Sequence, residues 1–214
     1  MQLFLQSPTM NNLRDPMPTL GRMMAFIDGE NLVARYQAMV QAGCMPVTHV
    51  KHRPDVYAWV PNAIWPGLNV VIRATYYTYC TGSADSVDSV AEEIRTFQFQ
   101  QYTIPGQNAP SRLIQTLTPQ IFWKQKNRSG KGVDIQMTVD ILTNVYQNNV
   151  DTVFLVSGDG DYGPVVAECK RLGKQVFVAA LTSGLSPVIR LAADYFLDLD
   201  SAFFETMAPA PSTP

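Results

Sequence analysis

The sequence has few cysteines and no excess of charge of either sign. Cys44, Cys80 and Cys169 are the three cysteines in 214 residues. An odd number of widely spaced cysteines is typical of neither a disulfide framework nor a CxxC zinc site, and it favours a reducing compartment. Sixteen Lys and Arg against eighteen Asp and Glu leave a formal charge of −2. A nucleic-acid partner must therefore be inferred from where the charges lie, not from their total.

Long apolar runs are also missing. The longest β-rich stretch, 69–80, is interrupted by Arg73, and no run approaches the roughly 18 to 20 apolar residues of a membrane span. The first 25 residues contain Asn, Arg, Asp and prolines where a secretory signal has a basic segment followed by an apolar one. We therefore expect a cytoplasmic protein that makes no use of a membrane.

The chain is long enough for one large core and short for two ordinary domains. Segments rich in proline predict a flexible leader over 1–22 and a disordered tail over 206–214. Between them we expect a single domain over 23–205. Two irregular segments within it, near 44–68 and 102–120, predict loop insertions.

Short apolar runs alternate with amphipathic stretches in this domain. Runs at 23–27, 151–156 and 176–180 are followed by predicted helices, and further helices are expected over about 84–101 and 133–148. Continuous apolar strands separated by helices are typical of a parallel sheet that is covered on both faces. The sequence therefore predicts an α/β fold.

Acidic residues follow two of the predicted strands. Asp28 comes directly after the first strand, and Asp159 and Asp161 follow the strand at 151–156. Ligands of open parallel sheets bind at the carboxyl ends of the strands, so these carboxylates converge if both strands are central. Each Asp could instead cap the next helix or close an Asx turn.

A fourth carboxylate begins a predicted helix. Rotation by about 100° per residue places Asp134 in the middle of the apolar stripe formed by Met137, Ile141 and Val145. A charge there is costly unless it caps the helix, has a cationic partner or binds a metal. The same rotation places Asp140 on the polar face, where a solvated side chain is expected.

Several carboxylates directed at one place repel one another. The ordinary outcome is a raised pKa on one of them or a bound cation. Oxygen ligands without a matching cluster of His or Cys favour Mg²⁺ or Mn²⁺ over Zn²⁺. Such a site commonly places a water or hydroxide for attack on a phosphodiester.

Four short motifs occur in a fixed order along the chain. They are FIDGENL at 26–32, KGVD at 131–134 with Asp140 six residues further on, VSGDGDY at 156–162 and ADYFLDL at 193–199. In this order and spacing they resemble the NYN domain of the PIN-like nuclease superfamily, in its LabA-like bacterial branch. The resemblance extends over about residues 23–200.

The resemblance implies a Rossmann-like three-layer α/β/α fold with a mostly parallel central sheet. It also implies an acidic centre that hydrolyses RNA with Mg²⁺ or Mn²⁺, so a metal-dependent endoribonuclease is expected. By position, the implied metal ligands are Asp28, Asp134, Asp159 and Asp161. Asn31 and Ser157 would support the site, and Asp140 stands at a position that is usually acidic in the family.

Two other functions remain open at this point. One is a module that keeps the fold and binds RNA or a protein without cleaving. The other is a phosphatase of the haloacid-dehalogenase type, in which a strand-end Asp such as Asp28 becomes phosphorylated. That family prefers Asp two residues after the nucleophile, where this chain has Glu30.

A basic segment precedes the predicted helix at 133–148. No acidic residue occurs between Glu93 and Asp134. A local cationic surface beside an aromatic side chain suits single-stranded or structured RNA, and a homodimer could form the groove for it. The alternative is a solvated loop beside a core Trp. The candidate RNA-binding residues are Trp123, Lys124, Lys126, Arg128 and Lys131.

Overall fold

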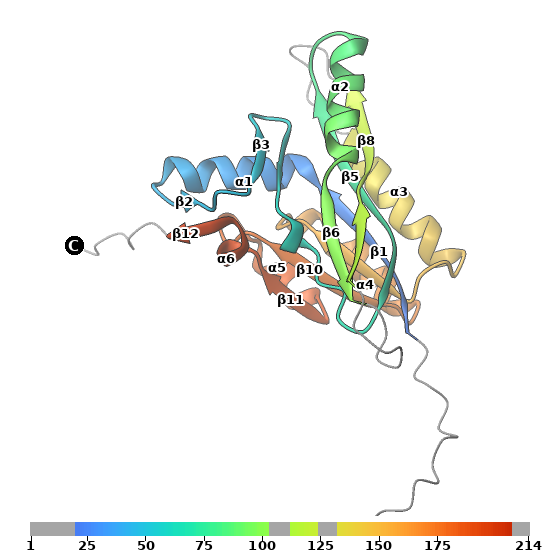
Figure 1. Ribbon diagram of the computed structural model, residues 1–214. Helices are drawn as coiled ribbons and strands as arrows, with labels where there is room; N and C mark the ends of the chain where they lie inside the picture. The colour runs from blue at the N-terminus through green and yellow to red at the C-terminus, as the bar shows by residue number, and fades with distance from the viewer. Residues whose placement is uncertain (1–19, 103–111, 124–131, 207–214) are drawn as a thin grey trace, which may run out of the picture.

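The protein is built around a six-stranded parallel sheet (Figure 1). The computed structural model describes residues 20–102, 112–123 and 132–206. The strand order is β11-β10-β9-β1-β5-β8, and every neighbouring pair is parallel. The strands are β1 (Arg22–Asp28), β5 (Val70–Cys80), β8 (Thr118–Trp123), β9 (Thr152–Val156), β10 (Gln175–Ala180) and β11 (Tyr195–Asp198).

The order of the strands reverses between β1 and β9. From β1 the chain builds outward through β5 to β8, then returns to β9 on the other side of β1 and continues to β10 and β11. In doubly wound sheets the crevice at such a reversal, outside the carboxyl ends of the strands, is where ligands bind. Both strands that border it are buried along most of their length because helices cover both faces.

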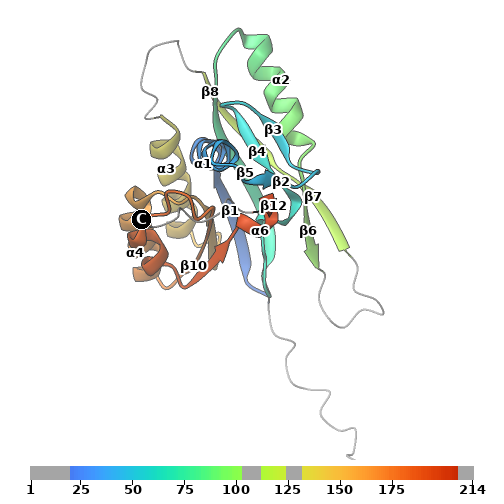
Figure 2. The same ribbon diagram turned by 90° about the vertical axis from the view of Figure 1, so that its left-hand side faces the viewer.

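Helices on the two faces of the sheet make two separate hydrophobic clusters, so the α/β/α prediction is confirmed. Leu32 and Tyr36 belong to one cluster, and Met137 and Ile141 belong to the other. Figure 2 shows α3 and α4 on the opposite side of the sheet from α2. The helices are α1 (Gly29–Gln41), α2 (Ala84–Arg95), α3 (Gly132–Tyr146), α4 (Gly163–Arg171), α5 (Pro187–Ala192) and α6 (Asp200–Phe203).

The segment 44–68 is more ordered than the loop insertion that its prolines predict. It holds β2 (Met45–Pro46), β3 (Lys51–Arg53), β4 (Tyr57–Trp59) and the 3-10 helix η1 (Pro61–Ala63). Trp59 is 1% exposed, and its Nε1 donates to the backbone oxygen of Gln98 at 3.1 Å. The buried aromatic side chains among the prolines therefore make this segment part of the core.

The helix expected over 84–101 ends early. It stops at Arg95, and β6 (Gln98–Tyr102) follows, antiparallel to β7 (Arg112–Thr116). Glutamine is a good helix former, but burial alternates along this segment as it does in a strand. Phe99 is fully buried, whereas Gln98 is exposed and Gln100 is half-buried. Because β7 and β8 occupy most of 112–123, the insertion predicted at 102–120 is not a loop over 112–120, and 103–111 lies outside the described residues.

The predicted leader and tail lie outside the described residues except at their inner ends. Arg22 already belongs to β1, and its guanidinium donates two hydrogen bonds to Asp151, at 3.1 and 3.0 Å. At the other end β12 (Phe204–Thr206) pairs with β2. None of the described helices is long and apolar enough to cross a membrane.

Candidate active site

Asp28 ends β1 and caps α1 at the point where the strand order reverses. Its Oδ1 accepts from the backbone N–H of Asn31 at 3.0 Å, and its Oδ2 accepts from the Ser157 hydroxyl at 2.9 Å. The residue is 3% exposed. Burial raises the pKa of Asp28 to about 7, although both hydrogen bonds oppose the shift, and the charges of Asp134 and Glu30 add to it.

Hydrogen bonds join the ends of β1 and β9. The Ser157 hydroxyl that donates to Asp28 also accepts from the backbone N–H of Asp159 at 3.1 Å. From α1, the side-chain oxygen of Asn31 accepts from the backbone N–H of Gly158 at 3.1 Å. Asn31 and Ser157 therefore fix the two strand-end segments relative to one another.

Asp159 and Asp161 lie on the turn that follows β9. Asp159 caps the 3-10 helix η2 (Gly160–Tyr162), and its Oδ1 accepts from the backbone N–H of Asp161 at 2.9 Å. Asp159 is half-buried and Asp161 is exposed. The capping role foreseen for strand-end carboxylates is thus real for Asp28 and Asp159. Each carboxylate oxygen keeps a further lone pair, so capping is compatible with binding a ligand.

Asp134 does not lie in the buried stripe of α3, and that expectation is wrong. The stripe consists of Val133, Met137, Ile141 and Val145, whereas Asp134 is exposed. Asp134 is in the first turn of the helix, directly after the fully buried Val133. The Tyr162 hydroxyl donates to its Oδ1 at 3.2 Å.

The four carboxylates predicted as ligands share one electrostatic environment. Partial burial raises the pKa of Asp134, and the charges of Asp159 and Asp161 raise it further, while the Tyr162 hydroxyl opposes the shift. Asp134 in turn raises the pKa of Asp28. The structure therefore brings Asp28, Asp134, Asp159 and Asp161 to the same edge of the sheet.

Asp140 lies apart from this group. It is six residues beyond Asp134 on α3, about 9 Å further along the helix axis. Its Oδ2 accepts from the Tyr77 hydroxyl and its Oδ1 from the Gln136 amide, both at 2.8 Å. The solvated side chain expected on the polar face is therefore a half-buried, hydrogen-bonded one.

The donor set fits a hard divalent cation. Among the described residues, no three His, Cys, Asp or Glu side chains form a ready-made ligand cage. Mg²⁺ is usually held by one or two carboxylates with water in its other positions, so it does not need such a cage. Asp28 receives its hydrogen bonds from a backbone N–H and a hydroxyl, which leaves a buried carboxylate without a cationic partner in the described part of the chain.

Two further side chains at this edge carry no role in the sequence-based prediction. Tyr162 is 2% exposed and bonds Asp134; its place directly after Asp161 in the motif is the signal that could have identified it. Arg35 lies on α1, four residues after Asn31 and hence on the same face. Its Nε is buried and has no hydrogen-bond partner among the described residues.

The candidate RNA-binding residues fall mostly outside the described residues. Lys124, Lys126, Arg128 and Lys131 are in 124–131, which the structure does not describe. Trp123, the last residue of β8, is 59% exposed, and its Nε1 donates to the backbone oxygen of Gly82 at 2.7 Å. It is therefore not the core Trp of the alternative interpretation, and base stacking on it stays a prediction.

The fold and the site define a Rossmann-like α/β protein with a carboxylate cluster at the strand-order reversal. Residues 22–200 match the model of the NYN domain. The chain therefore belongs to the NYN domain family, which is part of the PIN-like nuclease superfamily.

Two similar proteins are themselves uncharacterized. A protein of Methanocaldococcus jannaschii is 32% identical over 98 residues, which is 46% of this chain and 40% of that protein. The chain thus matches less than half the length of this relative. A crystal structure of a protein of unknown function from Vibrio parahaemolyticus has a TM-score of 0.59 at 18% identity. It covers 89% of this chain and 99% of its own, and it supports the fold alone.

Proposed function

We propose that this chain is a Mg²⁺- or Mn²⁺-dependent endoribonuclease that hydrolyses RNA phosphodiesters at the carboxylate cluster. The observation that carries the proposal is Asp28. It is 3% exposed, it faces other carboxylates, and its pKa is raised to about 7. A buried acid with a raised pKa at the ligand-binding edge of a sheet is typical of a functional site. Membership in a superfamily of nucleases supports phosphodiester hydrolysis.

The carboxylates of Asp28, Asp134, Asp159 and Asp161 would hold the cation, which when bound lowers the pKa of water and neutralises the charge on the phosphodiester. The hydrogen bonds from Asn31 N–H and the Ser157 hydroxyl hold the Asp28 carboxylate in one orientation.

The Tyr162 hydroxyl orients Asp134 in the same way. This hydrogen bond fixes one oxygen of Asp134 and leaves the carboxylate able to bind the cation.

The test is cleavage of labelled single-stranded and hairpin RNAs in Mn²⁺, Mg²⁺ or EDTA. Wild type should cleave with metal only, and Asp28→Asn should not cleave. Asp198→Asn is the matched control, because Asp198 also ends a strand of this sheet and accepts from the backbone N–H two residues on. It lies on the edge strand β11, three strands from β1. Loss of cleavage in both variants would refute the assignment.

A second readout is independent of turnover. An ion that binds only the folded protein stabilises it by mass action, by about 2.7 kcal/mol when the ion concentration is 100 times Kd. This stabilisation raises the melting temperature. Mn²⁺ should stabilise wild type and Asp198→Asn but not Asp28→Asn. Identical melting of all three proteins with and without Mn²⁺ would rule out the metal centre.

A binding module that does not cleave is the second candidate, because the exposed Trp123 could stack a base whether or not the carboxylates hold a metal. RNA binding without cleavage in Mn²⁺ or Mg²⁺ would identify it. The phosphatase alternative finds no support. Residues 22–200 match the NYN domain, and the position two residues after Asp28 is Glu30, where that phosphatase family prefers Asp.

A further inference from the structure

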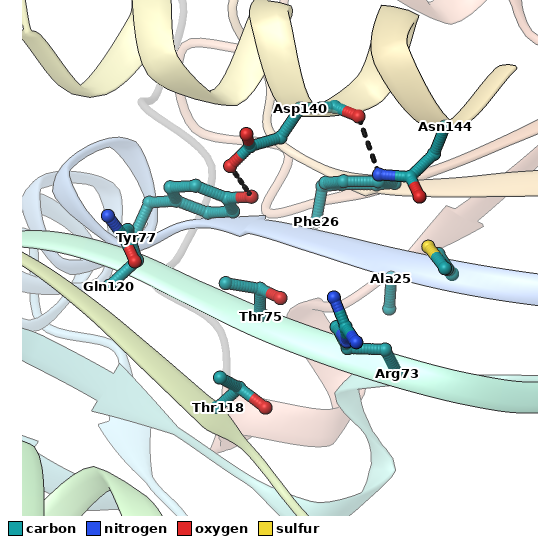
Figure 3. Close-up of a pocket in the computed structure, with 10 residues that line it drawn as sticks. Ala25, Phe26, Arg73, Thr75, Tyr77, Thr118, Gln120, Asp140 and Asn144 are labelled. Atoms are coloured by element: carbon teal, nitrogen blue, oxygen red, sulfur yellow. Dashed lines mark hydrogen bonds between the residues drawn. The ribbon is translucent and has the colours of Figure 1, made fainter. Parts of the chain in front are cut away.

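A polar hollow lies between α3 and the sheet, separate from the carboxylate edge (Figure 3). Its volume is about 170 Å³. The floor comes from β1, which supplies apolar residues at 24–26, and from β5 and β8. On these two strands Thr75 pairs with Thr118 and Tyr77 with Gln120, so the four side chains stand side by side. The polar groups that line it are Arg73, Thr75, Thr118, Gln120, Asp140 and Asn144.

The polarity of this part of the sheet is unusual for a face that carries a helix. The neighbouring part of the same face, under α3 and α4, is built from apolar residues such as Val153 and Leu155. On β8, by contrast, Thr118 and Gln120 are exposed. Two adjacent strands thus present polar side chains to a hollow that α3 only partly covers.

The hollow has one positive and one negative side chain, Arg73 on the sheet side and Asp140 on the α3 side. Arg73 is on the floor, is exposed, and forms no ion pair with any residue that the structure describes. Asp140 hangs from α3, as Figure 3 shows, and each of its oxygens already accepts one hydrogen bond. Each oxygen can accept one more. Asn144 and Gln120 add neutral amides.

This lining selects the chemical class of a ligand. Asp140 repels a phosphate or a carboxylate, and Arg73 repels an ammonium group. A neutral ring with donors on one edge and acceptors on another satisfies both walls. The volume is below the roughly 300 to 1,000 Å³ of sites for drug-sized molecules, so the hollow suits a single ring system.

We infer that the hollow binds a guanine base of the RNA substrate. Guanine offers O6 and N7 as acceptors to an arginine fork, and its Watson–Crick edge offers N–H donors to a carboxylate. Arg73 and Asp140 stand on the two walls that these two edges would face. The inference deepens the proposed ribonuclease function and rests on it for the polymer to which the base belongs.

The position of the hollow suits a base close to the bond that is cleaved. Asp140 is about 9 Å along α3 from Asp134, which corresponds to roughly three stacked nucleotides at about 3.4 Å each. A strand whose phosphate lies at the carboxylate edge can therefore place a base roughly three nucleotides away over β5 and β8. Cleavage should then occur at a fixed distance from a guanine.

The experiment is an NMR titration in EDTA with the 5′-monophosphates of guanosine, adenosine, cytidine and uridine, and with inorganic phosphate. The guanosine nucleotide should bind most tightly and shift the side-chain amide signals of Gln120 and Asn144. Phosphate alone should not displace it. Equal binding of all four nucleotides, or displacement by phosphate, would overturn the inference.

Arg73→Lys is the decisive variant, because it keeps the charge and loses the bidentate fork. It should weaken binding of the guanosine nucleotide about tenfold. Arg95→Lys, an exposed arginine of α2 on the other face of the sheet, should bind as wild type does. Unchanged binding in Arg73→Lys would refute recognition of the base.

Asp140→Asn tests the opposite wall, with melting temperature as a check on folding. It removes the negative charge and replaces one of the two acceptor oxygens by an NH₂ donor, so the preference for guanine over adenine should be lost. A retained preference in a folded variant would count against the inference.

The two proposals can fail separately. Nucleotide binding in EDTA does not depend on cleavage, so guanine-selective binding without RNA cleavage would refute the ribonuclease and leave the hollow as a guanine site. If wild type and Arg73→Lys cleave RNA at the same position relative to guanine, the ribonuclease stays in place and the base site is overturned.

Discussion

Replacing Asp28 by Asn should stabilise the metal-free protein at neutral and alkaline pH. The Asn amide keeps the size of the side chain, and its oxygen can still accept from Asn31 N–H. Its NH₂ group can donate to the Ser157 oxygen, since that hydroxyl can rotate. The variant therefore resembles Asp28 in its protonated form at every pH.

The magnitude follows from the raised pKa. Asp28 titrates at about 7 in the folded protein, against an ordinary value of 3.8 that we take for the unfolded chain. Between these values the folded state binds more protons than the unfolded state, so stability falls as pH rises through this window and is constant above it. At 1.36 kcal/mol per pH unit, the interval from pH 5 to pH 7 corresponds to about 3 kcal/mol.

The assay is urea unfolding in EDTA at pH 5 and pH 8. Over this interval Asp28→Asn should gain about 3 kcal/mol of unfolding free energy relative to wild type. Asp198→Asn, at an exposed strand end, should differ from wild type equally at both pH values. Adding Mn²⁺ at pH 8 should close the gap by stabilising wild type. A difference between wild type and Asp28→Asn that is the same at pH 5 and pH 8 would refute the reasoning.

Three further substitutions probe the same edge. Ser157→Ala removes a hydroxyl that lowers the pKa of Asp28, so the pH at which Mn²⁺ begins to raise the melting temperature should move upward. Tyr162→Phe loses a partly buried hydrogen bond to a carboxylate and should cost about 1 to 2 kcal/mol in urea unfolding, with slower RNA cleavage. Gly184→Ala should destabilise by about 1 to 2 kcal/mol or more, because Gly184 has φ +70° and an added Cβ would lie 2.3 Å from Nη1 of Arg35. A melting temperature equal to that of wild type would show that the Arg35 side chain is not packed there.

The central strands are predictable because both of their faces are buried. The runs at 23–27, 151–156 and 176–180 match β1, β9 and β10 within one residue at each end. The sequence does not distinguish β6 from the end of a helix, because its glutamines fit a helix. The burial of Phe99 depends on pairing with β7, which the local sequence does not reveal. Local preference decides such a segment only when tertiary contacts agree with it.

The convergence of Asp28 and Asp159 is predictable for a related reason. In a parallel sheet the carboxyl ends of all strands lie at one edge. A residue that directly follows a strand is therefore known to lie at that edge. Asp134 shows where this logic fails. Helical phase gives the direction of a side chain around the axis, but it does not say where the neighbouring layer ends. Asp134 is exposed although Val133 directly before it is fully buried.

The polar side of α3 predicts a solvated Asp140. A helix face that is exposed to water has the same sequence pattern as a helix face that packs on polar strands. The signal that separates the two is in other strands. Arg73 and Thr75 stand at alternate positions of β5, and Thr118 and Gln120 do so in β8. Two strands that are polar on the same face cannot supply a dry core, so a helix beside them must leave room for water or a ligand. Arg73 and Asp140 place opposite charges on the two sides of this room, which is the arrangement that the proposed guanine base would satisfy.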